Sequence, residues 1–292
     1  MAVSRTQRTL WFHMVPGLAV IAMVLGFPIA YSLWMATHAL QLATPGAPEF
    51  VGIANLLHVF ADERLGNAVL NSLKMTLLST AAPVLLGTVA AFALNAVSVR
   101  ARDVYLTILL IPVFVPFVAG GLLWLLLLHP QQGIVSYVLD TLGFGAQSWL
   151  GNPRTAWLVI VGVDTWHQTT LVTVLVLGGL VAVPAHLLEA ARIDGANARQ
   201  QLQRITLPLL RGPIAAAAAV RFVIALMTYD LVYILTQGGP GRTTETIPFY
   251  IGRVAFRHLD FGYASALSWW LLAATVLGVA AILTIGRGRA DW

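Results

Sequence analysis

The chain has 292 residues, of which 58% are hydrophobic, 10% are charged and none is a cysteine, and its formal net charge is +5. Soluble domains carry about a quarter charged residues, so this composition predicts an integral membrane protein. The absence of cysteine excludes disulfides, thiol catalysis and Cys-ligated metals.

Six apolar runs are long enough to cross a bilayer, whose hydrocarbon core takes about 20 helical residues. We expect an all-α integral membrane protein with six transmembrane helices in one domain over residues 1–292, with spans at about 12–34, 70–97, 104–128, 156–183, 213–235 and 263–285. The first run is predicted to remain as an anchor, because a signal peptide has a shorter apolar core and a small-residue cleavage site.

Proline and glycine predict where two of the spans bend or end. Pro112 and Pro116 predict kinks in the third span, where the carbonyl groups that the prolines free need donors from neighbouring helices. The sequence Gln237-Gly-Gly-Pro-Gly241 predicts an abrupt end for the helix of the fifth span.

Arginines are divided unevenly among the segments between the spans. With the N-terminus inside, the inner segments hold Arg5, Arg8, Arg100, Arg102, Arg192, Arg199, Arg204, Arg211, Arg287 and Arg289. The outer segments then hold only Arg64, Arg154, Arg242, Arg253 and Arg257. Because short cytoplasmic loops carry the excess of Lys and Arg, both termini and the segment 184–212 are predicted to be cytoplasmic. Topology also explains the positive charge better than nucleic-acid binding, since no basic face gathers the arginines.

Lys74 is the only lysine, and it lies in an apolar run without a preceding glycine-rich segment. A nucleotide-hydrolysing P-loop needs a lysine after such a segment to reach the phosphates. The chain therefore does not carry a P-loop ATPase. If ATP drives it, a partner subunit hydrolyses that ATP.

The fourth span carries three polar side chains on one helical face. Asp164, His167 and Gln168 stand at positions i, i+3 and i+4. An ionisable group at the bilayer centre costs at least ~2.5 kcal/mol, so such groups usually face a cavity or a partner. Two interpretations stand equally: a hydrogen-bonding lining for a hydroxylated solute, or pairing of Asp164 and His167 with another helix to hold the bundle together.

The fifth span carries ionisable groups on two faces. At 100° per residue, Arg221 and Thr228 share one face, whereas Asp230 lies on the opposite one. Arg221 lies near the predicted inner end and is expected to snorkel to the interface. Tyr229 and Tyr233, four residues apart, could stack on a sugar ring, although a tyrosine stripe at this spacing is more often helix packing.

The segment 184–212 is the long polar interruption between the apolar runs. One side of a short helix in it gathers three apolar residues: Leu187, Leu188 and Ala191. Gly195 can take the left-handed conformation that closes this helix, and Asn197 can cap the next one. Pro208 is predicted to stop that second helix. We therefore expect two short helices that meet at a turn.

The same segment resembles the signature loop of binding-protein-dependent ABC importer permeases. The resemblance rests on Glu189-Ala-Ala191, Gly195 and Ile205-Thr-Leu-Pro208. Ile193-Asp-Gly-Ala196 and Arg204-Ile-Thr-Leu-Pro-Leu-Leu210 more narrowly resemble the carbohydrate branch, the maltose and multiple-sugar permeases. Further blocks resemble this branch in the same order: Asp230-Leu-Val-Tyr-Ile-Leu-Thr236, Gly238-Gly-Pro240, Thr244-Glu-Thr246, Ala255-Phe256 and Phe261-Gly-Tyr-Ala264.

The resemblance implies the type I ABC importer permease fold and a permease subunit for a sugar or oligosaccharide in a bacterial or archaeal cell (inner) membrane. It implies that the loop is a coupling helix that docks into a cleft on the ATPase through Glu189, Ala190, Ala191, Asp194, Gly195, Ile205, Leu207 and Pro208. The resemblance favours Thr228 as a residue that contacts the solute. Asp230 would then have a structural role or would hold the outer end of the path closed. The candidate path residues are then Asp164, His167, Gln168, Thr228, Tyr229 and Asp230.

The partners that the resemblance implies are a second, homologous permease chain, two ATPase subunits that hold ATP and Mg, and an extracytoplasmic solute-binding protein. The sugar substrate and membrane lipid are the other expected binding partners. No cofactor, metal, catalytic residue or nucleic acid is expected on this chain. Permeases of similar sequence serve glycerol phosphate and amino sugars, so these solutes stay open as alternatives.

Two other classes of function remain as rivals. A proton-coupled secondary carrier would use Asp164, His167 and Asp230, but such carriers usually contain internal repeats of whole helix sets, and the two halves of this sequence show no self-similarity. A membrane enzyme with Asp164 and His167 as acid and base needs a further convergent polar group, for which the sequence offers no motif.

Overall fold

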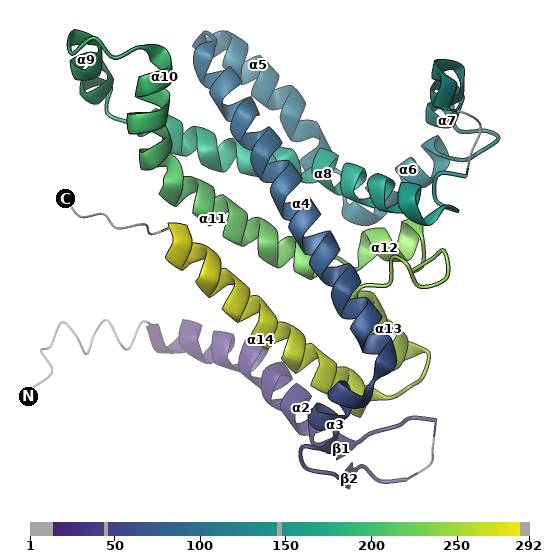
Figure 1. Cartoon of the computed structure of the whole chain (residues 1–292). Coiled ribbons are helices and arrows are strands. Elements are labelled where there is room, and N and C mark those ends of the chain that lie inside the picture. Colours follow the sequence, from purple (N-terminus) through teal and green to yellow (C-terminus); the bar gives the residue numbers. More distant parts are fainter. Residues whose placement is uncertain (1–13, 44–45, 145–147, 287–292) are drawn as a thin grey trace, which may run out of the picture. The chain divides into compact units, whose positions relative to one another are not determined.

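The computed structural model describes residues 14–43, 46–144 and 148–286, and these are mostly helical (Figure 1). Five helices are long and apolar enough to cross a membrane: Met14–Ala36, Glu63–Ala96 (α4), Pro153–Val181 (α8), Ala198–Leu226 and Phe261–Gly286 (α14). A bent helix pair brings the number of spans to six if the pair counts as one. The prediction of an all-α membrane protein is confirmed.

The helix Met14–Ala36 changes type along its length, and the elements between it and α4 are short. A π-helical turn η1 (Ala22–Gly26) leads into α2 (Phe27–Ala36). Strands β1 (His38–Ala39) and β2 (Glu49–Phe50) pair antiparallel, and α3 (Ala54–His58) and η2 (Val59–Ala61) follow.

The third span is broken rather than kinked. Helix α5 (Val99–Leu110) passes through the 3₁₀ turn η3 (Ile111–Phe114) to α6 (Phe117–Leu127), and the two parts are bent by 93°. The break contains Pro112 and Pro116, as the sequence predicts, because proline removes a helical donor and its ring clashes with the preceding turn. Helix α7 (Ile134–Leu139) and the turn η4 (Asp140–Phe144) follow.

Pro208 does not stop the helix that contains it, so that prediction was wrong. After α9 (Ala185–Ile193), the chain is helical through α10 (Ala198–Gln201), the π-helical turn η5 (Leu202–Thr206) and α11 (Leu207–Leu226). In a regular α-helix, the ring of Pro208 would clash with the carbonyl group four residues earlier. The wider π-helical turn directly before Pro208 relieves this conflict, and the helix continues.

The fifth span also differs from the predicted 213–235. It begins at Ala198 and ends at Leu226, and α12 (Asp230–Leu235) is a separate helix. The boundary was missed because Asp230 favours a helix N-terminus, where its charge meets the positive end of the helix dipole, over a helix interior. The predicted abrupt end is confirmed directly after α12, since Gln237 and Gly238 have φ of 50° and 81°. Helix α13 (Ile247–Phe256) leads on to α14.

The chain divides into two compact units, one running to Glu63 and including Ile251–Leu272, the other holding Arg64–Tyr250 and the chain from Ala273. In the first unit, the hydroxyl of Tyr263 donates to Asp62 at 2.6 Å, and the indole of Trp270 donates to the carbonyl of Leu56 at 3.1 Å. Side chains near the start of α14 thus bind the segment before α4.

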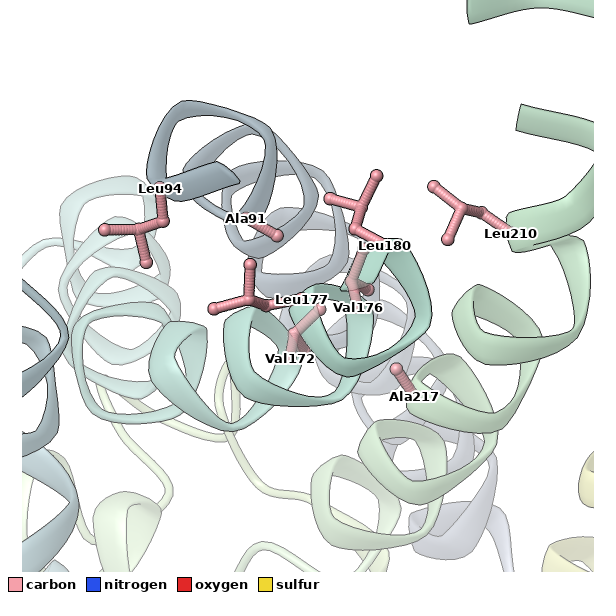
Figure 2. Close-up of a cluster of buried hydrophobic side chains, with 8 residues drawn as sticks. All are labelled: Ala91, Leu94, Val172, Val176, Leu177, Leu180, Leu210 and Ala217. Carbon is pink, nitrogen blue, oxygen red and sulfur yellow. The ribbon is translucent and has the colours of Figure 1, made fainter. Parts of the chain in front are cut away.

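The second unit is built around α4, α8 and α11, whose apolar residues form one buried cluster (Figure 2). Its members are Ala91, Leu94, Val172, Val176, Leu177, Leu180, Leu210 and Ala217. The helices approach closely at small residues: a Cβ atom added to Gly87 would lie 2.7 Å from Cβ of Val172. Small residues at such crossings are typical of helix packing in membranes.

Candidate functional site

The turn between α9 and α10 has the geometry that its sequence predicts. Gly195 has φ of 78°, the left-handed conformation that glycine adopts without strain. The amide of Gly195 donates to the carbonyl of Arg192 at 3.1 Å, and the amide of Ala196 donates to that of Ala191 at 2.9 Å. These two bonds form a Schellman motif, which satisfies the last carbonyl groups of α9.

A capping box begins the second helix. Oδ1 of Asn197 accepts from the amide of Gln200 at 2.9 Å, and Oε1 of Gln200 accepts from the amide of Asn197 at 2.8 Å. The side-chain amide of Gln201 donates to the carbonyl of Ala196 at 2.8 Å, across the turn. The angle between α9 and α10 is therefore fixed by local hydrogen bonds.

The described chain leaves this loop open. None of the residues of α9 is buried, and Ile193, an isoleucine at its end, is 86% exposed. Of the predicted docking residues, Glu189, Ala190, Asp194, Gly195 and Leu207 are exposed, whereas Ala191, Ile205 and Pro208 are half-buried. An amphipathic helix whose apolar residues all stay at least partly exposed has a surface suited to a partner.

Asp164 and Arg221 form an ion pair between two of the long helices. Nη2 of Arg221, on α11, lies 2.6 Å from Oδ2 of Asp164, on α8, and both side chains are 0% exposed. The same Nη2 donates to the carbonyl of Ser79 on α4, so one guanidinium joins three helices. Asp164 thus pairs with a neighbouring helix, which is one of its two predicted roles.

The expectation that Arg221 snorkels to the interface was wrong. The prediction placed Arg221 close to a helix start at residue 213, but the helix begins at Ala198 and ends at Leu226, so Arg221 lies far from that start, near the other end, and its side chain is fully buried. A guanidinium that cannot reach water must be paired, and Asp164 is the partner.

His167 and Gln168 are buried and bonded within the described chain. Nε2 of His167 lies 2.7 Å from the carbonyl oxygen of Val115, and its ring stacks on Phe117 with centroids 4.1 Å apart. Because a carbonyl can only accept, Nε2 carries the hydrogen, and Nδ1 then accepts from the side-chain amide of Gln168 at 3.2 Å. The two side chains complete a local network around the break in the third span.

Sequence reasoning missed Thr170, whose side chain also bonds the backbone beside this break. Its hydroxyl donates to the carbonyl of Leu109, just before η3, while His167 donates to the carbonyl of Val115 on the other side of the break. Side chains of α8 thus bond carbonyls on both sides of the break. The carbonyls four residues before the two prolines accept instead from amides of their own segment, so the expectation about those carbonyls was wrong. The sequence did contain a signal for this role. His167 and Thr170 are polar residues at positions i and i+3 on α8, and the preceding span contains two prolines.

Thr228, Tyr229 and Asp230 lie where α11 ends and α12 begins. Thr228 is buried, and its hydroxyl donates to the carbonyl of Ile224 at 3.0 Å. Tyr229 stacks on Tyr233 with ring centroids 5.4 Å apart and on Phe249 at 6.0 Å, so packing occupies its ring. Asp230 is exposed in the first turn of α12.

The start of α4 holds the segment that follows α12. The amide of Asn71 donates to the carbonyls of Arg242 and Glu245 at 3.0 and 3.1 Å, and the hydroxyl of Ser72 accepts from the amide of Ile247 at 2.7 Å. Arg64 pairs at 3.1 Å with Glu245, which is 1% exposed. The Asn71-Ser72 pair is thus a positioning element.

The described residues do not gather three His, Asp or Glu side chains where a metal ion could be held. The candidate site has three parts. These are the open loop with its preorganised turn, the buried polar side chains on α8, and the end of α11 at Leu226.

Residues 83–291 match the family described as binding-protein-dependent transport system inner membrane component. The chain is 32% identical to the trehalose/maltose transport system permease protein MalF of Thermococcus litoralis, covering 96% of this chain and 94% of that protein. It is 31% identical to the sulfoquinovosyl glycerol transport system permease protein SmoG of Agrobacterium fabrum, covering 94% and 89%. It is 30% identical to the sn-glycerol-3-phosphate transport system permease protein UgpA of the same organism, covering 85% and 86%.

A solved structure shares the fold. A chain of a bacterial alginate ABC transporter, crystallised in complex with an alginate pentasaccharide-bound periplasmic protein, superposes with a TM-score of 0.82. The two chains are 20% identical, and the match covers 98% of this chain and 96% of that one. The fold is that of a type I ABC importer permease, a transport component without enzymatic activity of its own. The chain belongs to the family of inner membrane components of binding-protein-dependent transport systems, as a multi-pass permease of the carbohydrate branch.

Proposed function

We propose that this chain is one of two permease chains of an ATP-driven importer that carries a sugar or oligosaccharide delivered by a solute-binding protein. The loop at residues 184–212 is cytoplasmic and docks on an ATPase subunit. ATP and Mg are held by two such subunits, and a second, homologous permease chain completes the solute path. The family match and the sugar-named relatives support this assignment.

The observation that carries the proposal is the turn between α9 and α10. Force can pass through a short helix pair only if the angle between the two helices is held. Here Gly195 and the Asn197 capping box hold it by backbone geometry and hydrogen bonds, while α9 keeps its surface free for a partner. A preorganised and uncovered element is what docking into a cleft requires.

Two substitutions test the loop. Gly195→Val forces a β-branched residue into the left-handed conformation, and Glu189→Lys reverses a charge that can pair with a cation or a backbone donor on the ATPase. Both variants are expected to remain in the membrane but to lose the stimulation of ATP hydrolysis by the solute-binding protein. The measurement compares stimulated hydrolysis in proteoliposomes at equal complex content. Unchanged stimulation in both variants would show that the loop is not the coupling element.

The composition of the complex provides a second test. Purification from the native operon is expected to yield one copy of this chain, one homologous permease and two ATPase subunits. A transport-active homodimer of this chain, without the second permease, would contradict the proposal.

The path for the solute is proposed to include Thr228 and the polar face of α8. Asp164, His167 and Gln168 each bond to a neighbouring part of this chain, so they shape the wall of the path. Thr228, at the break between α11 and α12, is the residue of this set that we place nearest to the solute. Tyr229 and Asp230 flank the same break.

Glycerol phosphate is a second candidate solute, because a relative of similar identity is named for it. The charge of Arg221 is balanced by Asp164 and is not offered to a phosphate, which favours an uncharged sugar. Uptake of labelled maltose, trehalose and glycerol 3-phosphate by the reconstituted complex with its own solute-binding protein separates the two. Uptake of the phosphate alone would overturn the sugar assignment.

A further inference from the structure

The ion pair between Asp164 and Arg221 joins the two helices that lead into and out of the loop at residues 184–212. Helix α8 ends at Val181, directly before the loop, and α11 continues from the loop without interruption. With a rise of roughly 1.5 Å per residue, Asp164 lies about 25 Å along α8 from that end. The pair therefore connects the two arms of the loop far from the loop itself.

Closer to the loop, small and aliphatic residues form contacts between the same two helices. A Cβ atom added to Gly179 would lie 2.7 Å from Pro213, and Ala217 belongs to the apolar cluster with Val172 and Val176 (Figure 2). Apolar contacts have no preferred direction, and lipid tails are as apolar as these side chains. This part of the interface holds the helices together by close packing.

The ion pair is directional. Nη2 of Arg221 reaches Oδ2 of Asp164 at 2.6 Å and also donates to the carbonyl of Ser79 on α4. A charge-assisted hydrogen bond tolerates only a few tenths of an ångström before it weakens. A slip of one helical turn, about 5.4 Å, would break the bond and leave two charges bare in a buried site. The pair therefore opposes a shift of α8 against α11 by a turn.

The pair is poorly suited to stability alone. Two donors of Arg221, Nε and Nη1, find no hydrogen-bond partner among the described residues, although they are buried. A buried ion pair that is incompletely satisfied contributes no more to stability than apolar side chains of similar volume. Its distinctive contribution is then the fixed geometry between the helices.

We propose that Asp164 and Arg221 are positioning residues for energy coupling, which lock the register of α8 against α11 so that a displacement of the loop moves both helices as one body. The inference rests on the coupling role proposed above for the loop. Without the lock, part of the displacement is lost as sliding between α8 and α11, and hydrolysis drives less transport.

The test uses the intact complex in proteoliposomes with its own solute-binding protein. Single substitutions leave one buried charge unpaired and so disturb assembly. The decisive variant is the apolar double substitution Asp164→Leu with Arg221→Met, and the matched control is Asp164→Glu with Arg221→Lys, which keeps both charges. The apolar variant is expected to keep the unfolding temperature of the complex but to lose roughly fivefold or more in solute carried per ATP hydrolysed. The charged control is expected to carry more solute per ATP than the apolar variant, because both variants alter the wall of the path but only the apolar one removes the ion pair. Wild-type transport per ATP in the apolar variant overturns the proposal.

A second measurement works on the intact pair and does not depend on the folding of any core variant. Because the chain has no native cysteine, Leu158 on α8 and Val220 on α11, both exposed, can be replaced by cysteine and spin-labelled. The distance between the labels is expected to be the same in the nucleotide-free and ATP-bound complexes. A change of several ångströms between the two states would show that the helices slide, and the proposal would fail.

Failure of this inference and failure of the proposed function are distinguishable through Gly195→Val. If Gly195→Val keeps full stimulation of hydrolysis, the loop is not the coupling element and the proposed function falls. If Gly195→Val uncouples while the apolar double variant transports normally, only the register lock is refuted.

Discussion

The imidazole of His167 on α8 donates from Nε2 to the carbonyl oxygen of Val115 at 2.7 Å, where the third span breaks. The bond replaces a helical donor that the break removes, and an unsatisfied buried carbonyl costs ~1–3 kcal/mol. The break between α5 and α6 is thus stabilised by a side chain from another helix. The Nε2 donor of His167 is therefore already used in this bond.

His167→Asn is expected to destabilise the complex by ~1–3 kcal/mol, because the shorter amide cannot reach the carbonyl of Val115. His167→Gln is the matched control, since its side-chain nitrogen occupies about the position of Nε2 and keeps the donor. Thermal unfolding of the purified complex measures the difference. Equal unfolding temperatures for the two variants would contradict the bridging role.

The same pair of variants tests the rival interpretation of a proton-coupled carrier. A carrier that moves protons through His167 would lose uptake in His167→Gln, because an amide does not titrate. We expect His167→Gln to retain uptake and to remain dependent on ATP. Uptake that survives deletion of the ATPase gene would instead support the carrier.

Gly195→Ala is expected to cost about 1 kcal/mol or more at the turn, because φ of 78° is unfavourable for a residue with a Cβ atom. The cost is purely conformational, since no atom lies within 4 Å of the added Cβ. Gly178→Ala, at an exposed helical glycine that also has open space, is the control. Stimulated ATP hydrolysis should fall in the first variant and stay unchanged in the second. An equal fall in stimulated ATP hydrolysis in both variants would contradict the explanation from the left-handed conformation of Gly195.

Asn197→Ala is expected to loosen the start of α10 by roughly 0.5–2 kcal/mol, because the amide of Gln200 loses its acceptor. Asn197→Asp keeps an oxygen in the capping position and should behave as wild type. Hydrogen exchange of the amides of residues 197–201 in the intact complex reports the change directly. Faster exchange in the alanine variant alone is the expected outcome, and identical exchange in all three proteins would refute the capping role.

Thr228→Val is expected to weaken uptake or alter the range of solutes while the ATPase remains bound. The substitution preserves volume and removes one hydroxyl, which bonds back to the carbonyl of Ile224 in the last turn of α11. Thr173→Val is the matched control, because its hydroxyl also bonds one turn back, to Thr169, in a buried part of α8. Competition of unlabelled sugars against the labelled solute gives the specificity. If both variants lose assembly and keep normal specificity, Thr228 has a packing role.

The sequence by itself determined the class of the protein and the shape of its loop. Apolar runs of bilayer length predict spanning helices whatever their neighbours, because backbone groups in lipid must be bonded within the helix. The turn at Gly195 and the cap at Asn197 depend on residues within four positions of each other, and the structure has both. The glycine-rich end after α12 is local in the same way.

Only the tertiary structure decided what the polar side chains in the spans contact. A helical period assigns Asp164 and His167 to one face, but the depth and rotation of the neighbouring helices decide that this face meets Arg221 and Val115. The distance of Arg221 from the start of its helix depends in turn on the helix continuing through Pro208 by way of a π-helical turn, which side-chain periodicity does not reveal. Pairing between distant segments is set by packing, and this is why local sequence rules could name the participants without naming their partners.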